Sequence, residues 1–203
     1  MQYDDAIPRG MSAQHSSAKE MISDHELVRL IAAGDHNAMR VLFVRHNVRV
    51  FRFAVRIVGN EATAEDVVSE VFVDVWRNAS RFEGRSQVAT WILGIARHKA
   101  LAAARRRSIG QFDDDIALIE DPADGPEIAA QKADRSAILR ECLEQLSPAH
   151  REIIDLVYYH ERTIDDVASI LGVPLNTVKT RMFYARKRIA AQLAARGIEQ
   201  AWL

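Results

Sequence analysis

The sequence has very little cysteine and lacks the residue patterns of common catalytic and metal sites. Of 203 residues only Cys142 is a cysteine, which excludes a disulfide within the chain. The seven histidines have no cysteine partners and no His-x₃-His spacing, so no metal site is predicted. A Gly-rich phosphate loop, a nucleophile elbow and paired carboxylates in an apolar setting are also missing. The sequence therefore predicts no enzyme and no cofactor.

Long hydrophobic runs are missing as well. No apolar stretch approaches the length of a membrane span, and the N-terminus lacks a basic, then apolar, then small-residue signal pattern. We therefore expect a cytoplasmic protein without membrane insertion. A hydrophobic content of 48% is enough for packed cores, and the formal net charge is only −1. That average hides strong segregation of charge along the chain.

Strand-like alternation of apolar and polar residues is absent, whereas helical spacing with caps and breakers recurs. We therefore predict an all-α fold of two small helical domains. The first domain contains four expected helices. These are a helix capped by Ser23 and Glu26 and closed by Gly34, a longer one from about 37 to 58, a third opened by Thr63 and Asp66, and a fourth that follows the loop Arg81 to Gln87 and reaches Arg105 to Arg107.

An acidic segment separates the two helical blocks. Seven acids and no base lie between Ser108 and Gln131, and Pro122, Gly125 and Pro126 interrupt any helix. We predict a flexible N-terminal extension (1–20), a first domain (21–108), an acidic linker (109–131), a second domain (132–196) and a short tail (197–203). In the second domain, Cys142 shares a helical stripe with Ile138 and Leu146, which favours a buried structural thiol.

The segment from Thr163 to Arg188 is typical of a helix-turn-helix. Thr163 and Asp166 have capping-box spacing, and Gly172 is suited to end the first helix in the left-handed region. Pro174 stands where the second helix starts, at a position where its missing N–H costs little. Ser147 and Pro148 are an equivalent start signal for the preceding helix.

The second of these helices separates an apolar stripe from a cationic face. Its expected buried residues are Val178, Met182, Ala185, Ile189 and Leu193, which leaves Asn176, Thr180, Phe183 and Lys187 pointing outward, flanked by Lys179 and Tyr184. No acid occurs between Val173 and Gly197, and six cations do. An outward Phe among cations suits the major groove, where it can contact a thymine methyl. A plain bundle with a solvated basic helix is the simpler alternative, but the combined signals favour DNA binding.

The first domain carries a second cationic segment. Six Lys and Arg residues and no acid lie between Gly84 and Phe112, close to Phe82, Trp91 and His98. Aromatic side chains beside cations can hold unpaired bases, although Trp91 is more typical of a core residue. On the third helix Asp66, Glu70, Val73 and Arg77 share an outward face, which is either solvated or the docking face for a basic partner helix.

Three motifs in this order resemble the extracytoplasmic-function sigma factors of the sigma-70 family, the specificity subunits of bacterial RNA polymerase. The resemblance covers about Ser23 to Ala194. The motifs are AEDVVSEVFVDVWRN at 64–78, FEGRSQVATWILGIARHKALAAARR at 82–106 and GVPLNTVKTRMFYARKRI at 172–189. Family members often have Gln where this chain has Ser69, Asn where it has His98, and Arg where it has Tyr184.

The resemblance implies three functional surfaces. It places Asp66 and Glu70 against the clamp coiled coil of the largest subunit of core RNA polymerase. It implies that the loop 83–87 and the helix after it capture a flipped base of the −10 element, with Glu83, Arg85, Ser86, Arg97 and His98 as candidates. The recognition helix is expected to read the −35 element of promoter DNA through Asn176, Thr177, Lys179, Thr180, Arg181, Phe183, Tyr184 and Lys187. An anti-sigma factor is a further expected partner.

Two other functions remain open at this level. One is a regulator that binds duplex DNA alone through its helix-turn-helix, with the first block as a sensor or dimerisation module. The other is a sigma-mimicking decoy that sequesters an anti-sigma factor. The basic, aromatic first block argues against the regulator. Such decoys usually carry an additional regulatory domain, which we do not expect within these 203 residues.

Overall fold

A computed structural model of the protein describes residues 22–108 and 138–198, and helices with short turns make up these two ranges, without a strand. The predicted all-α class is confirmed. The expected extension at 1–20 and the acidic linker at 109–131 lie outside the described residues. Within the two described ranges, no helix is long and apolar enough to cross a bilayer.

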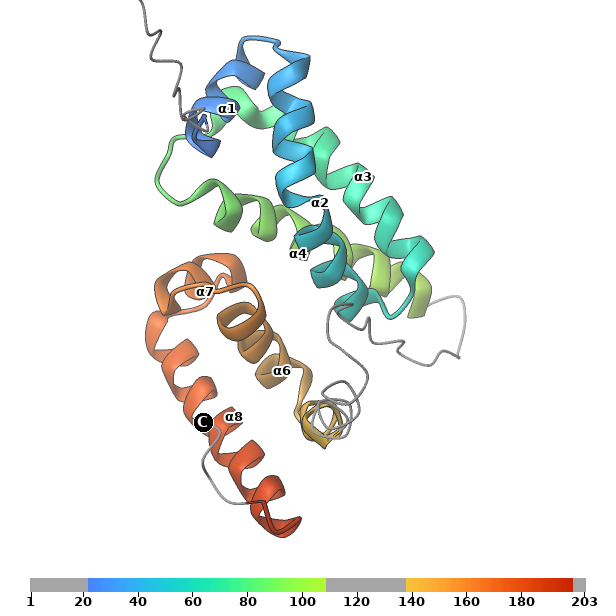
Figure 1. The fold of residues 1–203 in the computed structure, drawn as a ribbon, viewed down its shortest axis with the longest axis vertical. Helices are drawn as coiled ribbons and strands as arrows, with labels where there is room; N and C mark the ends of the chain where they lie inside the picture. Colours follow the sequence, from blue (N-terminus) through green and yellow to red (C-terminus); the bar gives the residue numbers. More distant parts are fainter. Residues whose placement is uncertain (1–21, 109–137, 199–203) are drawn as a thin grey trace, which may run out of the picture.

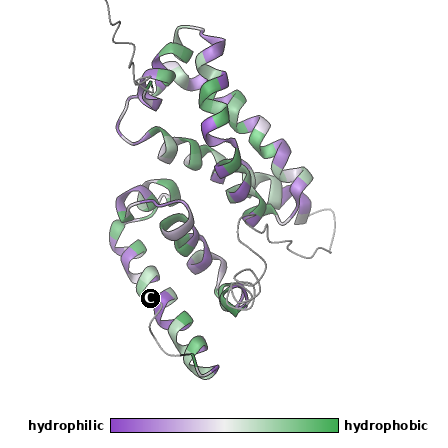
Figure 2. Ribbon diagram, in the orientation of Figure 1, coloured by the Kyte–Doolittle hydropathy of each residue, from purple (hydrophilic) through white to green (hydrophobic). Residues whose placement is uncertain are grey.

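The first domain is a bundle of four helices whose apolar faces meet in one core (Figure 1). Its elements are α1 (Asp24–Ala32), α2 (His36–Val58), α3 (Glu61–Asn78), the 3₁₀ turn η1 (Ala79–Arg81) and α4 (Val88–Ser108). Leu42 and Phe53 of α2, Val71 of α3 and Ile92 of α4 are among the fully buried side chains. Hydrophobic and hydrophilic residues alternate along the helices of both domains, as expected of amphipathic elements (Figure 2).

The start of α3 differs from the sequence expectation. The helix begins at Glu61 behind the N-cap Asn60, whose side-chain oxygen accepts from the Thr63 amide at 2.9 Å. The Thr63 hydroxyl donates to the same oxygen at 3.0 Å. The predicted cap of Thr63 and Asp66 is therefore wrong, because a stronger capping residue one turn earlier recruits Thr63.

The cap of α1 is only half of the expected box. The Ser23 hydroxyl accepts from the Glu26 amide at 3.2 Å, but the Glu26 carboxylate binds the Arg29 guanidinium, at 2.8 and 2.5 Å. The turn between α2 and α3 is as predicted, since Gly59 has a φ of 69° and its N–H donates to the Val55 carbonyl. A left-handed residue ends α2 there at no steric cost for glycine.

The second domain contains the helix-turn-helix. It comprises a helical segment at 138–144, α6 (Pro148–Ile154), the π-helical turn η2 (Asp155–Tyr159), α7 (Ile164–Leu171) and α8 (Leu175–Ala195). Thr163 and Asp166 form the reciprocal capping box, and Gly172 has a φ of 66°, so both predictions are confirmed. Cys142 is buried, in agreement with a structural thiol.

Candidate nucleic-acid and polymerase interfaces

Helix α8 presents the polar and aromatic face that its sequence predicts. The buried stripe of α8 consists of the five expected residues, Val178, Met182, Ala185, Ile189 and Leu193. Packing of this stripe against α6 and α7 fixes the rotation of α8. Of the eight predicted −35 residues, six are exposed, namely Asn176, Lys179, Thr180, Phe183, Tyr184 and Lys187, while Thr177 and Arg181 are half-buried.

The two aromatic residues on this face stand out by their exposure. Phe183 is 62% and Tyr184 54% exposed, and their rings lie edge to face with centroids 5.5 Å apart. Each ring restricts the other, so a partner meets a preformed apolar ridge between Lys179 and Lys187. Leaving two such rings in water costs hydrophobic free energy, which binding to a partner would recover.

The loop before α4 forms the second candidate surface. Glu83 and Arg85 are exposed and pair with each other, with Arg85 Nε 2.5 Å from Glu83 Oε2. Gly84 between them has a φ of 70°, which turns the chain sharply. Ser86 is half-buried and His98 is exposed on α4. Trp91 is half-buried and packs on Phe82 with ring centroids 4.8 Å apart, as the core interpretation predicts.

Arg97 lies in an unexpected place, because the second domain covers its side of α4. Its guanidinium forms two hydrogen bonds to the Glu152 carboxylate, at 2.7 and 3.3 Å. The Thr90 hydroxyl donates to Asp166 at 2.8 Å, and Arg162 donates to the Gln87 side chain at 2.9 Å. Arg56 of α2 pairs with Asp155. These four pairs are termed the interdomain contact, and α4 and α7 lie face to face there (Figure 1).

Asp166 takes part in both local and long-range structure. Burial opposes its ionisation, but hydrogen bonds from Thr163 and Thr90 and the charge of Arg162 outweigh that cost. The pKa of Asp166 is therefore below its usual value, and the carboxylate is charged at neutral pH. The sequence predicted the cap that Asp166 makes to Thr163, but nothing in the local pattern indicated the bond to Thr90.

The outward face of α3 is exposed as predicted. Asp66, Glu70, Val73 and Arg77 all face solvent, and so does Ser69. Glu70 is also within ion-pair distance of two cations of α4, Lys99 at 3.5 Å and Arg106 at 3.9 Å. Lys99 lies closer to Asp74, at 2.9 Å, and the pKa of Lys99 is raised chiefly by its hydrogen bond to Asp74.

An exposed apolar stripe on α2 was not anticipated. Val41, Val44 and Val48 recur at i, i+3 and i+7 and are exposed, Val44 by 68%. Phe43 is exposed beside them and contacts Phe72 of α3 edge to face. The spacing could have been read from the sequence, but α2 has apolar residues on several faces, and only packing shows which one stays uncovered.

Comparison with known proteins assigns the family. The model of sigma-70 region 2 matches residues 42–109, and that of sigma-70 region 4 matches residues 136–189. The chain is 28% identical to the ECF RNA polymerase sigma factor SigK of Mycobacterium tuberculosis over 160 residues, which cover 77% of this chain and 86% of SigK. It is 29% identical to SigL of the same species over 171 residues, which cover 82% of this chain and 95% of SigL.

Solved structures have the same fold. CnrH, in complex with the cytosolic domain of CnrY, superposes with a TM-score of 0.63 at 24% identity, covering 85% of this chain and 97% of CnrH. The sigma factor RpoE of Bartonella quintana, in complex with the anti-sigma factor NepR, superposes with a TM-score of 0.61 at 23% identity, covering 76% of this chain and 96% of RpoE. The matches to both sigma-70 regions and to the two curated sigma factors show that the chain belongs to the sigma-70 family and is an alternative sigma factor of the extracytoplasmic-function group that directs transcription initiation.

Proposed function

We propose that the three exposed surfaces divide the work of promoter recognition. Helix α8 reads the −35 element as a duplex, the loop 83–87 with α4 captures a base of the −10 element, and α3 docks on the clamp coiled coil of core RNA polymerase. The domains are 21–108 and 132–196, joined by the acidic linker. The factor works in the cytoplasm and contributes binding energy, without catalysis of its own.

One observation carries the −35 assignment, namely the exposed Phe183 and Tyr184 between Lys179 and Lys187. An α-helix fits the major groove, where cations meet phosphates and an aromatic ring can contact a thymine methyl. Arg181 is half-buried and lies nearer the domain body, which suits a phosphate contact. Tyr184, where relatives often carry Arg, is expected to shift the preferred −35 sequence.

The −10 surface requires the two domains to separate. Thr90, Gln87 and Arg97 engage the second domain in the interdomain contact. A DNA strand that follows the loop 83–87 onto α4 competes with Glu152 for Arg97. The free chain therefore binds −10 DNA poorly, and core polymerase favours the separated form by holding α3 and α8 apart.

The polymerase surface is tested by reversing charge on α3. Asp66→Lys is expected to weaken binding to core polymerase about tenfold or more, because like charges across an interface cost several kcal/mol. Asp66 is exposed, so the change leaves the core of the domain intact. Glu70→Lys should act in the same direction, with an added effect through Lys99 and Arg106. Affinity is measured by fluorescence anisotropy with labelled factor.

Glu65→Lys is the matched control, since Glu65 is exposed on α3 and lies about 140° around the helix from Glu70 at 100° per residue. It introduces the same change of charge on another face. Equal losses of affinity for core polymerase in Asp66→Lys and Glu65→Lys would indicate a non-specific effect of charge. That result would contradict the assignment of this face of α3 to polymerase binding.

An anti-sigma factor is the expected regulatory partner. CnrH and RpoE of B. quintana were each solved in complex with another protein, named as the anti-sigma factor NepR for RpoE. A protein of this kind would keep the present factor from core polymerase until a signal releases it.

The function as a whole is tested by run-off transcription. Purified core polymerase with this factor should produce transcripts from discrete start sites on genomic fragments, and core polymerase alone should not. Alignment of the upstream sequences should give two conserved elements, at −35 and −10. A complete lack of promoter-specific transcript would rule out the proposed role.

A further inference from the structure

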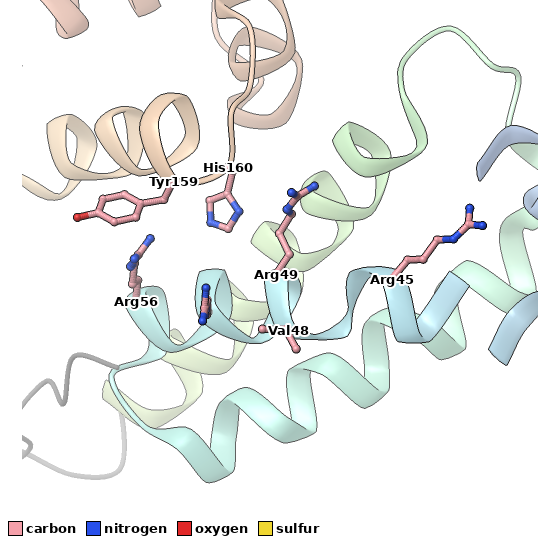
Figure 3. A pocket seen from close by; sticks show the side chains of 7 residues that line it. Arg45, Val48, Arg49, Arg56, Tyr159 and His160 are labelled. Carbon is pink, nitrogen blue, oxygen red and sulfur yellow. The ribbon is translucent and has the colours of Figure 1, made fainter. Parts of the chain in front are cut away.

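A cavity with a strongly basic lining lies between α2 and the end of η2. Its volume is about 290 Å³, close to the lower end of the range for small-molecule sites. Five residues of α2 and two of the second domain line it: Arg45, Val48, Arg49, Arg52, Arg56, Tyr159 and His160. Figure 3 shows Arg49 and Arg56 extending from α2 toward Tyr159 and His160.

The arginines form one stripe because of their spacing. Positions 45, 49, 52 and 56 recur at i, i+4, i+7 and i+11, which places them within about 60° on the helix surface. From Arg49 to Arg56 the stripe extends about 10 Å at 1.5 Å per residue. None of the surfaces assigned to promoter or polymerase binding uses these side chains.

Two arginines of the stripe form ion pairs with acidic residues. Arg45 pairs with Asp24, with Arg45 Nη1 2.8 Å from Asp24 Oδ1, and Arg56 pairs with Asp155. No ion pair within the described ranges engages Arg49. Burial is the main cause that lowers the pKa of Arg56, and the nearby charge of Arg52 lowers it further. A guanidinium loses its proton less readily than any other cationic side chain, so Arg56 keeps its charge beside Asp155.

His160 is an independent sign of a missing ligand. It is only 2% exposed, and neither of its ring nitrogens has a hydrogen-bond partner. Nε2 is 3.3 Å from Asp155 Oδ2, without the geometry of a hydrogen bond. Burial, and then the charges of Arg56, Arg49, Arg162 and Arg52, lower the pKa of His160 to about 3. The ring is therefore neutral and carries one N–H.

The imidazole is held in position by the first domain. Its ring lies edge to face on Phe53 of α2, with centroids 5.3 Å apart, and Phe53 is fully buried. His160 is a lining residue of the cavity, and this packing keeps its ring from turning to solvent. Unsatisfied buried donors of this kind are rare, and they are costly when no partner binds.

We propose that this cavity binds a compact polyphosphate anion, a ligand with two or more linked phosphate groups. Each phosphate accepts several hydrogen bonds and matches the fork of an arginine, and neutral His160 supplies one more donor. A single phosphate would reach one or two arginines, whereas a chain of phosphates follows the stripe. A DNA duplex is too wide to reach a histidine that is 2% exposed.

Binding at this place has a consequence for the whole molecule. The arginines belong to the first domain, and Tyr159 and His160 belong to the second. A ligand that bridges them stabilises the interdomain contact and so disfavours the form that exposes Arg97. The site does not depend on the promoter contacts proposed above. A failure of either proposal would therefore leave the other unaffected.

The test is calorimetric titration of the full chain with sodium tripolyphosphate, and with a nucleoside triphosphate in a second arm, at constant ionic strength. Saturable one-to-one binding is expected, weakened at least tenfold by Arg49→Ala. Arg40→Ala is the matched control, because Arg40 is exposed on the same helix outside the cavity. This substitution removes the same positive charge as Arg49→Ala. His160→Gln, which keeps an N–H donor, should weaken binding less than His160→Leu.

The outcomes separate clearly. Equal affinity for the two ligands identifies an inorganic phosphate chain as sufficient, and tighter binding of the nucleotide adds a contact to the base. A wild-type chain without saturable binding would overturn the proposal. Equal losses in Arg40→Ala and Arg49→Ala would do the same, because they indicate non-specific attraction of anions. Circular dichroism of each variant checks that its helices are intact.

Discussion

Alanine in place of Phe183 or Lys179 is expected to lower transcription from the cognate promoter about 5- to 150-fold, the effect of losing a base contact worth about 1–3 kcal/mol. Both side chains are exposed on α8, and neither takes part in the buried stripe that holds the helix. Removal of either one therefore changes the DNA contact and not the fold. The assay is run-off transcription, with core binding measured in parallel.

The two substitutions should differ from the loss of a phosphate contact. Arg188 is an exposed cation of the same helix, outside the predicted base-reading set, so Arg188→Ala should weaken use of all promoters about equally. Phe183→Ala should instead change the ranking of promoters that differ in the −35 element. If its ranking across a randomised −35 library matched that of the wild type, the role of Phe183 in sequence recognition would be wrong.

A second large effect is expected from Glu152→Arg, which should raise binding of the free chain to a single-stranded −10 oligonucleotide tenfold or more. The carboxylate of Glu152 now holds the Arg97 guanidinium at 2.7 and 3.3 Å. Reversal of its charge sets two cations face to face at a half-buried position, at a cost of several kcal/mol. The domains then separate, and α4 becomes accessible.

Glu144→Arg is the control, because Glu144 is exposed in the same domain and its carboxylate forms no ion pair within residues 22–108 and 138–198. It makes the same change of net charge away from the interdomain contact. Energy transfer between labels at positions 40 and 188 should fall in Glu152→Arg and stay unchanged in Glu144→Arg. A fall in transfer without a gain in −10 binding would show that the contact does not limit DNA access.

Much of the local structure could be predicted from short-range chemistry. The capping box of Thr163 and Asp166, the left-handed Gly172 and the buried stripe of α8 each depend on residues within about four helical turns of one another. The error at the start of α3 is of the same local kind. Asn60 and Thr63 are both good capping residues. Asn60 becomes the N-cap of α3 because its side-chain oxygen accepts hydrogen bonds from the amide and the hydroxyl of Thr63.

The helices of both domains, the capping box of α7 and the exposed faces of α3 and α8 could be predicted from the sequence, because they follow from periodicity and from hydrogen bonds between near neighbours. The packed structure was needed to show that Arg97 binds Glu152, that Thr90 binds Asp166, and that an arginine stripe of α2 faces His160. These partners lie far apart along the chain, and no local pattern encodes which helix faces pack together. Packing of the two domains thus sets which of the predicted DNA-binding residues are free.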